Sequence, residues 1–249
     1  MSETIDILYS SDKSLAATTR RGQGVLMEDP YSGFSVCTYS GDNEKHYLEN
    51  LRLLADFLGI EENHIVMPRQ THTSNVLVLH SLPDSPESLQ DIDAVITKQK
   101  GVAVGVNTAD CVAVLLIDED NGVCAAVHSG WRGTVNNIAG KCVELMIESG
   151  ADASSIKAFI PPCIHVECFE VGEEVSELFT SEYVNRELGS KPHIDLVSMI
   201  RKQLKSHGVK SGNITVSADC TRCNPDKYFS ARALGVKSGR NFSFTMLKP

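Results

Sequence analysis

Several features that mark common protein classes are missing from this chain of 249 residues. It has no surplus of basic residues: 23 Lys and Arg stand against 32 Asp and Glu, which gives a formal net charge of -9. No stretch gathers the basic residues together. Proteins that bind nucleic acid regardless of its sequence usually hold the phosphates with an excess of Lys and Arg. The sequence therefore argues against nucleic-acid binding and favours a small-molecule partner.

Signals for membrane insertion and for secretion are missing as well. No run of about 18 apolar residues occurs, although a membrane-spanning helix needs a run of that length. The first ten residues, MSETIDILYS, do not combine a basic region with an apolar one, as a secretory signal does. We therefore expect a cytoplasmic protein without a membrane segment. In that compartment the eight cysteines are expected to be thiols, some of them packed in the core and some of them ligands.

The chain also has no fixed-period repeat, no low-complexity tract and no linker rich in Gly, Ser or Pro. The one interval rich in turn residues, 80–91, is short enough to be a surface loop. The hydrophobic fraction of 42% and the chain length allow a substantial core. The sequence therefore predicts a single domain that spans residues 1–249.

Apolar residues recur with helical spacing in three segments. In the first, residues 46–59, one apolar face is expected to pack on the core and Gly59 to end the helix. The second and third segments are residues 134–150 and 195–208. The expected packing faces of the first two are Leu48, Leu51, Leu54, Ala55 and Leu58, and Val135, Ile138, Cys142, Leu145 and Met146.

Short apolar runs rich in β-branched residues are typical of strands. They do not alternate regularly with helices, as the strands of a doubly wound sheet would. The pattern predicts an α+β fold with mixed sheets. The predicted strands are residues 64–67, 75–80, 93–97, 102–106, 111–118, 123–128, 156–160, 213–219 and 241–247.

Residues able to bind a metal lie at the edges of three predicted strands: His72 in RQTHTSNV, Cys111 in NTADCVAVLL and His128 in AAVHSGWRG. One thiolate and two imidazoles suit zinc, and three protein ligands leave a coordination position open. Alone, each of these residues would more often be an ordinary buried side chain. Gly130 and Gly133 flank the only tryptophan beside His128, where glycine either marks a turn or permits a close backbone approach.

These segments, taken together, resemble the YfiH-like or laccase-domain family (DUF152) over the whole chain. Residues 91–146 are similar to its Asp-Ala-Asp, Ala-Asp-Cys and His-Ala-Gly-Trp-Arg-Gly signature in order and spacing. RQTHTSNV, PPCIHVECFEVGEEV, KPHIDL, DCTRC and SGRNFSF resemble its other signatures. The chain departs from the family pattern at Thr73, Ser129 and Pro161. Members were once named multicopper polyphenol oxidases and later purine nucleoside phosphorylases.

The resemblance implies a zinc site formed by His72, Cys111 and His128, with copper as the alternative metal. It implies mixed sheets packed together with helices outside, as in the cysteine hydrolase fold of bacterial deamidating toxins. Asp110 would be a catalytic residue that supports a metal ligand or contacts the substrate, although a role as a turn carboxylate fits equally well. The implied reactions are phosphorolysis of adenosine, inosine and 5'-methylthioadenosine and hydrolytic deamination of adenosine.

Phosphorolysis requires a cationic side chain that binds phosphate. Candidates in the motif segments are arginines, although an arginine there is as often a structural partner of a carboxylate. They are Arg69, Arg132 and Arg232, with Arg222 as a further one. The Arg132 guanidinium is expected to reach the site or to pair with a carboxylate such as Asp110.

A competing zinc site can be assembled from His165, Glu167, Cys220 and Cys223, which imitate the H-x-E and P-C-x-x-C pattern of nucleobase deaminases. We disfavour it, because the interval between its halves is too long and Asp219 stands where that pattern has proline. A solitary C-x-x-C is also weak evidence for a metal.

Three other functions use the same residues differently or not at all. A copper oxidase of phenols typically carries paired imidazoles as H-x-H, and no such pair occurs among the eight histidines. A metal-free cysteine hydrolase would use Cys111 as nucleophile and His128 or His72 as base. A binding module without activity is least favoured, because it gives no reason for three ligand-type residues in separate motifs.

Overall fold

The protein is described here from a computed structural model that covers residues 3–249. Its strands are β1 (Ile5–Ser10), β2 (Ser14–Thr19), β3 (Ile65–Val66), β4 (Val76–Leu79), β5 (Ala94–Thr97), β6 (Ala103–Thr108), β7 (Val112–Asp118), β8 (Val123–Ser129), β9 (Lys157–Ile160), β10 (Val184–Asn185), β11 (His193–Ile194), β12 (Ile214–Val216) and β13 (Asn241–Leu247). Its α-helices are α1 (Glu44–Leu58), α2 (Trp131–Val135), α3 (Ile138–Glu148), α4 (Glu173–Ser176), α5 (Leu196–Ser206) and α6 (Ala231–Leu234).

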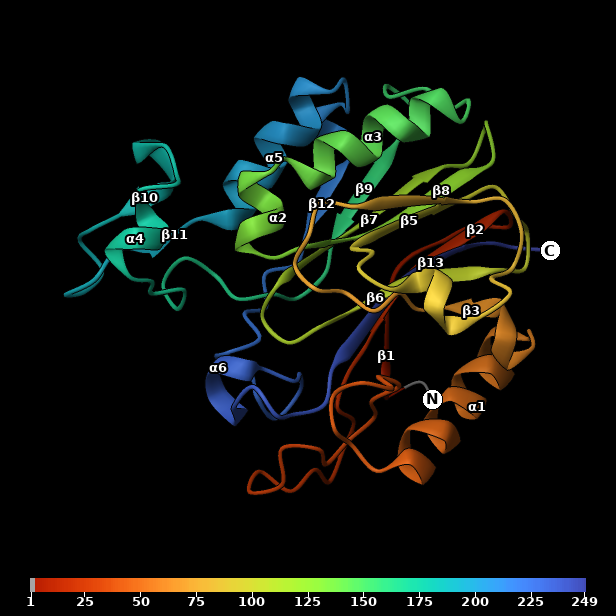
Figure 1. Ribbon diagram of the computed structural model, residues 1–249, viewed down its shortest axis with the longest axis horizontal. Coiled ribbons are helices and arrows are strands. Elements are labelled where there is room, and N and C mark those ends of the chain that lie inside the picture. The colour runs from red at the N-terminus through yellow and green to blue at the C-terminus, as the bar shows by residue number, and fades with distance from the viewer. Residues whose placement is uncertain (1–2) are drawn as a thin grey trace.

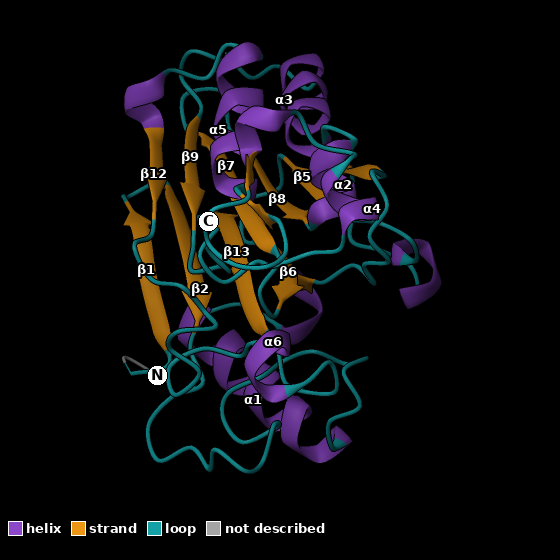
Figure 2. Ribbon diagram, turned by 90° about the vertical axis from the view of Figure 1, so that its left-hand side faces the viewer, coloured by secondary structure: helices purple, strands orange, loops and turns teal. Residues whose placement is uncertain are grey.

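Two mixed sheets lie against each other between layers of helix (Figure 1). One sheet has six strands in the order β12-β9-β7-β8-β5-β4, and the other has five in the order β1-β2-β13-β6-β3. Helices α3 and α5 cover the outer face of the six-stranded sheet, and α1 covers the outer face of the five-stranded sheet (Figures 1 and 2). The predicted α+β fold with packed mixed sheets and outer helices is confirmed.

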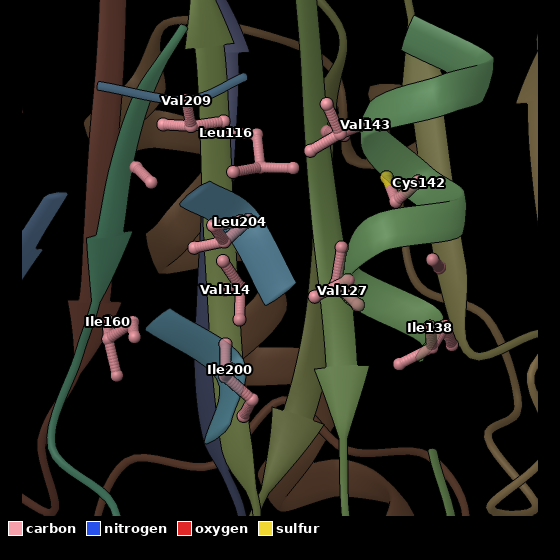
Figure 3. Close-up of a cluster of buried hydrophobic side chains, with 14 of the residues drawn as sticks. Val114, Leu116, Val127, Ile138, Cys142, Val143, Ile160, Ile200, Leu204 and Val209 are labelled. Carbon is pink, nitrogen blue, oxygen red and sulfur yellow. The ribbon is translucent and has the colours of Figure 1, made fainter. Parts of the chain in front are cut away.

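Strand β7 shows why the central strands read as unbroken apolar runs. Its side chains alternate between the two faces of the sheet, so Val114 and Leu116 pack against the helices while Leu115 and Ile117 pack against the other sheet. Figure 3 shows the helix side of this core, where Ile200 of α5 lies over the strand. Both faces are buried, so no position on the strand is left for the polar residues that mark a half-exposed strand.

Helix α1 ends just before Gly59 as the sequence predicts, but it begins at Glu44, two residues before the predicted start. The Asn43 side chain accepts a hydrogen bond from the backbone N–H of Lys45, and Gly59 follows in the left-handed conformation with φ 66°. Leu54 is fully buried on the packing face, but Leu48 is 45% exposed. The prediction that Leu48 packs on the core is therefore wrong, because it lies in the first turns of the helix, where the core does not reach.

The segment predicted as one helix over residues 134–150 is two helices. The first, α2, ends at Val135, and α3 begins at Ile138. Between them Asn137 adopts a left-handed backbone conformation with φ 57°, which asparagine tolerates better than most residues. This turn separates α2, which begins beside His128, from the longer helix that covers the sheet.

All nine predicted strands are present, with ends that differ by up to a few residues, while β1, β2 and the two-residue strands β10 and β11 were not predicted. The sequence of β2, SLAATT, has little of the bulky β-branched character that marks a strand, yet all six residues are buried. Position in the sheet decides its conformation, because β2 pairs with both β1 and β13. None of the helices in residues 3–249 is long and apolar enough to cross a membrane.

Candidate metal and catalytic site

Cys111 and His128 come together because their strands are neighbours. Cys111 immediately precedes β7, and His128 is the last residue but one of β8. The antiparallel register of these strands pairs Ala113 with His128, so the start of β7 meets the end of β8. The two side chains therefore lie at the same end of the six-stranded sheet.

His72 reaches the same point from the loop between β3 and β4. Its Nε2 lies 3.9 Å from the Sγ of Cys111, and the two imidazole rings meet edge to face with centroids 4.9 Å apart. One ligand atom from each of His72, Cys111 and His128 lies within 4.8 Å of the other two. His72 has a φ of 64°, which is unusual outside glycine and indicates that the loop holds it in a strained position.

Asp93 organises this end of the sheet, and the sequence analysis gave it no role. Its side chain is fully buried. One carboxylate oxygen accepts hydrogen bonds from Nδ1–H of His128 at 2.7 Å and from the backbone N–H of His72 at 3.1 Å. The other accepts from the backbone N–H and the hydroxyl of Thr73, at 2.8 and 2.6 Å. One carboxylate therefore fixes both histidines.

The hydrogen bond to Asp93 also determines which ring nitrogen of His128 is free. Nδ1 carries the proton that Asp93 accepts, which leaves Nε2 available to a ligand. A carboxylate behind a histidine in this way is the usual arrangement at metal sites. A signal for Asp93 was present in the sequence, because it follows Asp91 in the DIDAV segment just before a predicted strand.

The close packing around position 130 explains why the second residue after His128 is a glycine. A Cβ added to Gly130 would lie 3.0 Å from Cδ2 of His72 and 3.2 Å from Sγ of Cys111. These distances are shorter than nearly all real Cβ contacts. The backbone of Gly130 therefore packs directly against the site, which a larger residue would crowd.

The electrostatics of the site favour a Cys111 thiolate beside a protonated His128. Burial raises the pKa of the Cys111 thiol, but the charge and hydrogen bonding of His128, helped by His72, outweigh it and lower the pKa to about 6. Burial lowers the pKa of His128, but Cys111 and Asp93 outweigh it and raise that pKa to about 9. The sulfur is therefore the anionic form that acts both as metal ligand and as nucleophile.

Asp110 lies next to the site in sequence, and its carboxylate has hydrogen-bond partners outside the three ligands. It accepts hydrogen bonds from the hydroxyl of Thr221 and from the backbone N–H of Arg232, both at 2.7 Å. Its φ of 89° is strained for a residue with a side chain. In the structure Asp110 connects the turn before Cys111 to the turn that holds Thr221 and to helix α6, and its catalytic role stays a prediction.

In residues 3–249 no hydrogen bond, ion pair or ring contact joins the candidate arginines to the three ligands. Arg132 stacks its guanidinium over the Trp131 ring at 4.0 Å, so the expected pairing with Asp110 is wrong, because Asp110 already has other partners. Arg232 donates to the backbone oxygen of Glu170 at 3.0 Å, and the Arg69 side chain is exposed. Their roles in phosphate binding stay predictions.

The residues of the competing zinc site are only partly brought together. Cys220 and Cys223 do lie together, but the third member of the group is Cys168 rather than His165 or Glu167. In residues 3–249 this is the second of two groups of His, Cys and acidic side chains with ligand atoms within 4.8 Å of one another. The residues of the deaminase-like pattern do not assemble, because His165 contributes only its backbone N–H to the Sγ of Cys220.

The fold and the site define a class: an α+β protein with two packed mixed sheets and a site of two imidazoles and one thiolate at the end of one sheet. Residues 15–248 match the model of the family described as multi-copper polyphenol oxidoreductase laccase. The chain belongs to this family.

Relatives with assigned names cover nearly the whole chain. It is 39% identical to an adenosine deaminase, RL5, from an unknown prokaryotic organism, over 97% of both chains. It is 37% identical to a purine nucleoside phosphorylase of Bacteroides thetaiotaomicron, over 95% of this chain and 92% of the relative. Among solved structures, the hypothetical protein YfiH of Bacillus licheniformis superimposes with a TM-score of 0.90 at 25% identity, over 99% of this chain and 97% of the other.

Proposed function

We propose that the protein is a zinc-dependent purine nucleoside phosphorylase that also deaminates adenosine. Its substrates would be adenosine, inosine and 5'-methylthioadenosine, together with phosphate or water. The observation that carries this proposal is the convergence of His72, Cys111 and His128 within 4.8 Å, beside a carboxylate that orients one of the histidines. The names of the relatives, an adenosine deaminase and several purine nucleoside phosphorylases, supply the substrate class.

The residues present fit a zinc ion. Zinc takes imidazole nitrogen and thiolate sulfur at about 2.0–2.3 Å, so three ligand atoms around one ion lie roughly 3–4 Å apart. The Cys111 to His72 distance of 3.9 Å falls in that range. The same donors also accept copper, which the family description names. We favour zinc, since the histidines include no H-x-H pair and neither reaction requires a redox change.

In this proposal His72, Cys111 and His128 hold the metal, and Asp93 keeps Nε2 of His128 directed at it. Zinc bound there supplies Lewis acidity and activates water for attack on a purine carbon. The Gly130 backbone leaves space next to the three ligands that a side chain would fill. Phosphorolysis needs in addition a cation for phosphate, and Arg132, Arg69 and Arg232 are the candidates from the motif segments.

The test combines metal analysis with product analysis. The purified protein should contain zinc, convert adenosine and phosphate to adenine, and convert adenosine to inosine in the absence of phosphate. Cys111→Ser should abolish both reactions. A matched control is Cys124→Ala, which changes a buried cysteine at the opposite end of β8 from His128, and it should retain both. Oxygen consumption with a phenol that depends on copper and on Cys111 would instead support the oxidase.

The phosphate site is tested at Arg132. An ammonium keeps the charge of a guanidinium but loses its planar pair of donors, so Arg132→Lys should raise the KM for phosphate while zinc content and deamination stay unchanged. Arg69→Lys and Arg232→Lys serve as comparisons in the same assay. Unchanged phosphorolysis, deamination and zinc content in Arg132→Ala would reject a role for this residue.

A second candidate function is a metal-free cysteine hydrolase. It is favoured by the order Asp93, His128, Cys111, in which a buried carboxylate orients an imidazole that lies beside a thiol. This is the arrangement that activates a nucleophile. Metal removal separates the two candidates: a chelator should abolish purine conversion by a zinc enzyme, whereas a cysteine hydrolase would keep its activity and lose it on alkylation of Cys111.

A further inference from the structure

Three cysteines from two separate turns of the chain, none of them a ligand of the candidate active site, meet in one cluster. Cys168 ends a turn that begins after His165, and Cys220 and Cys223 flank a second turn in the C-x-x-C segment. The Sγ atoms of Cys168 and Cys223 lie 3.4 Å apart, and all three Sγ atoms lie within 4.8 Å of one another. No role has been given to this cluster so far.

Two of the three sulfurs accept contacts from groups outside the cluster. The backbone N–H of His165 donates to the Sγ of Cys220 at 3.4 Å. The guanidinium of Arg222 donates to the Sγ of Cys168 at 3.7 Å. Two donors, one of them cationic, are thus directed at two of the three sulfurs, which is the kind of outer contact that supports metal-bound thiolates.

The spacing of the sulfurs suits a tetrahedral metal ion. With a Zn–S distance of about 2.3 Å, two thiolates on one zinc ion lie about 3.8 Å apart. The cluster brackets this value, from 3.4 Å up to at most 4.8 Å. A turn with C-x-x-C spacing supplies two ligands from adjacent backbone, as in structural zinc sites. Cys223 is exposed and Cys168 is half-buried, so an ion has access from solvent.

We propose that Cys168, Cys220 and Cys223 form a second zinc site, with three thiolate ligands and a fourth position open to solvent. Binding forms three Zn–S bonds and releases the thiol protons to solvent, without any redox change. This site differs from the deaminase-like site considered from the sequence, because His165 and Glu167 are not among its ligands. The proposal is independent of the reaction assigned to the first site.

The location of the cluster gives this ion a structural role. Thr221, between the two cysteines of the C-x-x-C turn, donates its hydroxyl to Asp110, the residue before Cys111. Cys220 also forms a β-bridge with Cys163. Zinc at the cluster would join this turn to the turn that carries Cys168. It would thereby stabilise the turn whose Thr221 hydroxyl donates to Asp110, without contacting the reacting atoms.

The test measures metal content in four forms of the protein, each saturated with Zn2+ under argon and then desalted. The wild-type chain should retain about two zinc ions, and the double variant Cys168→Ser with Cys223→Ser should retain about one. Cys111→Ser should also retain about one, and the triple variant should retain none. A wild-type chain with one zinc ion that the double change leaves in place would overturn the proposal.

Cobalt provides a second readout that does not depend on the double variant folding well. In the Cys111→Ser background, Co2+ should produce the ultraviolet charge-transfer absorption of thiolate ligands, and the further change of exposed Cys223 to Ser should weaken it by about a third. An unchanged absorption would also overturn the proposal. So would a Cys168–Cys223 disulfide found by mass spectrometry in protein prepared under argon with excess zinc, since the cluster would then be a redox pair.

Discussion

The role of Asp93 gives the sharpest prediction, because one buried carboxylate accepts hydrogen bonds from five donors. These are Nδ1–H of His128, three backbone N–H groups and one hydroxyl; the backbone groups and the hydroxyl belong to Thr71, His72 and Thr73. Burial acts to raise the pKa of Asp93, but the hydrogen bonds from His128 and Thr73 outweigh it and lower that pKa. The carboxylate is therefore ionised at neutral pH.

Asp93→Asn keeps the shape of this side chain and removes half of its accepting capacity. One oxygen becomes an NH2 group, which then faces donors that it cannot pair with. Whichever way the amide turns, about two buried N–H groups lose their acceptor, and each unsatisfied group costs about 1–3 kcal/mol. We therefore expect the free energy of unfolding to fall by about 4 kcal/mol. Zinc content should fall as well, since His128 loses the partner that fixes its tautomer.

Urea unfolding followed by the fluorescence of Trp131 measures the loss of stability, provided that the slope with urea stays constant. The control is Asp91→Asn, an exposed carboxylate two residues away with a left-handed φ of 56° that asparagine also adopts. It should cost less than about 1 kcal/mol. Equal stabilities and equal zinc contents in the two variants would refute the argument that Asp93 organises the site.

Three further predictions concern the site, the core and a surface ion cluster. Gly130→Ala should lower zinc content and both purine reactions, because the added methyl group crowds the ligands, whereas Gly212→Ala, with open space around it, should change neither. Leu54→Ala should reduce the free energy of unfolding by about 2–5 kcal/mol and Leu48→Ala by less than about 0.5 kcal/mol, since only Leu54 is fully buried; equal losses in urea unfolding would contradict this. Partial burial acts to raise the pKa of Glu119, but hydrogen bonds, first from two serines and then from Lys157, lower it from 4.5 to about 2. The folded pKa is below the unfolded one, so this stabilisation is present above about pH 4.5 and is lost as the pH falls towards 2; Glu119→Gln should flatten that decline in acid unfolding curves.

Local patterns predicted most of the elements of the fold, and the exceptions have separate causes. A run such as residues 112–117, apolar at every position, is a strand because both of its faces are buried, and this can be read from the run itself. Strand β2, made of small and polar residues, becomes a strand only through its neighbours β1 and β13. The break at Asn137 was missed because helical spacing continues across it.

For the candidate site, the sequence by itself determined the residue types and where they stand in the chain. Cys111 and His128 lie at strand ends, His72 lies in the loop before β4, and the glycine after Ser129 allows the backbone to pack beside them. The resemblance to a family added the expectation that the three belong together. Neither source identified Asp93 as the residue that holds two of these segments in place.

Only the tertiary structure decided which of these residues meet. The contact of Asp93 with His128 depends on the pairing of β5 with β8, and the contact of Cys168 with Cys223 joins residues 55 positions apart. Strand order and register are set by the packing of whole sheets, and no short segment carries that information. The sequence therefore determines which side chains are available, whereas the pairing of strands determines the distances that bring separate ligands into one site.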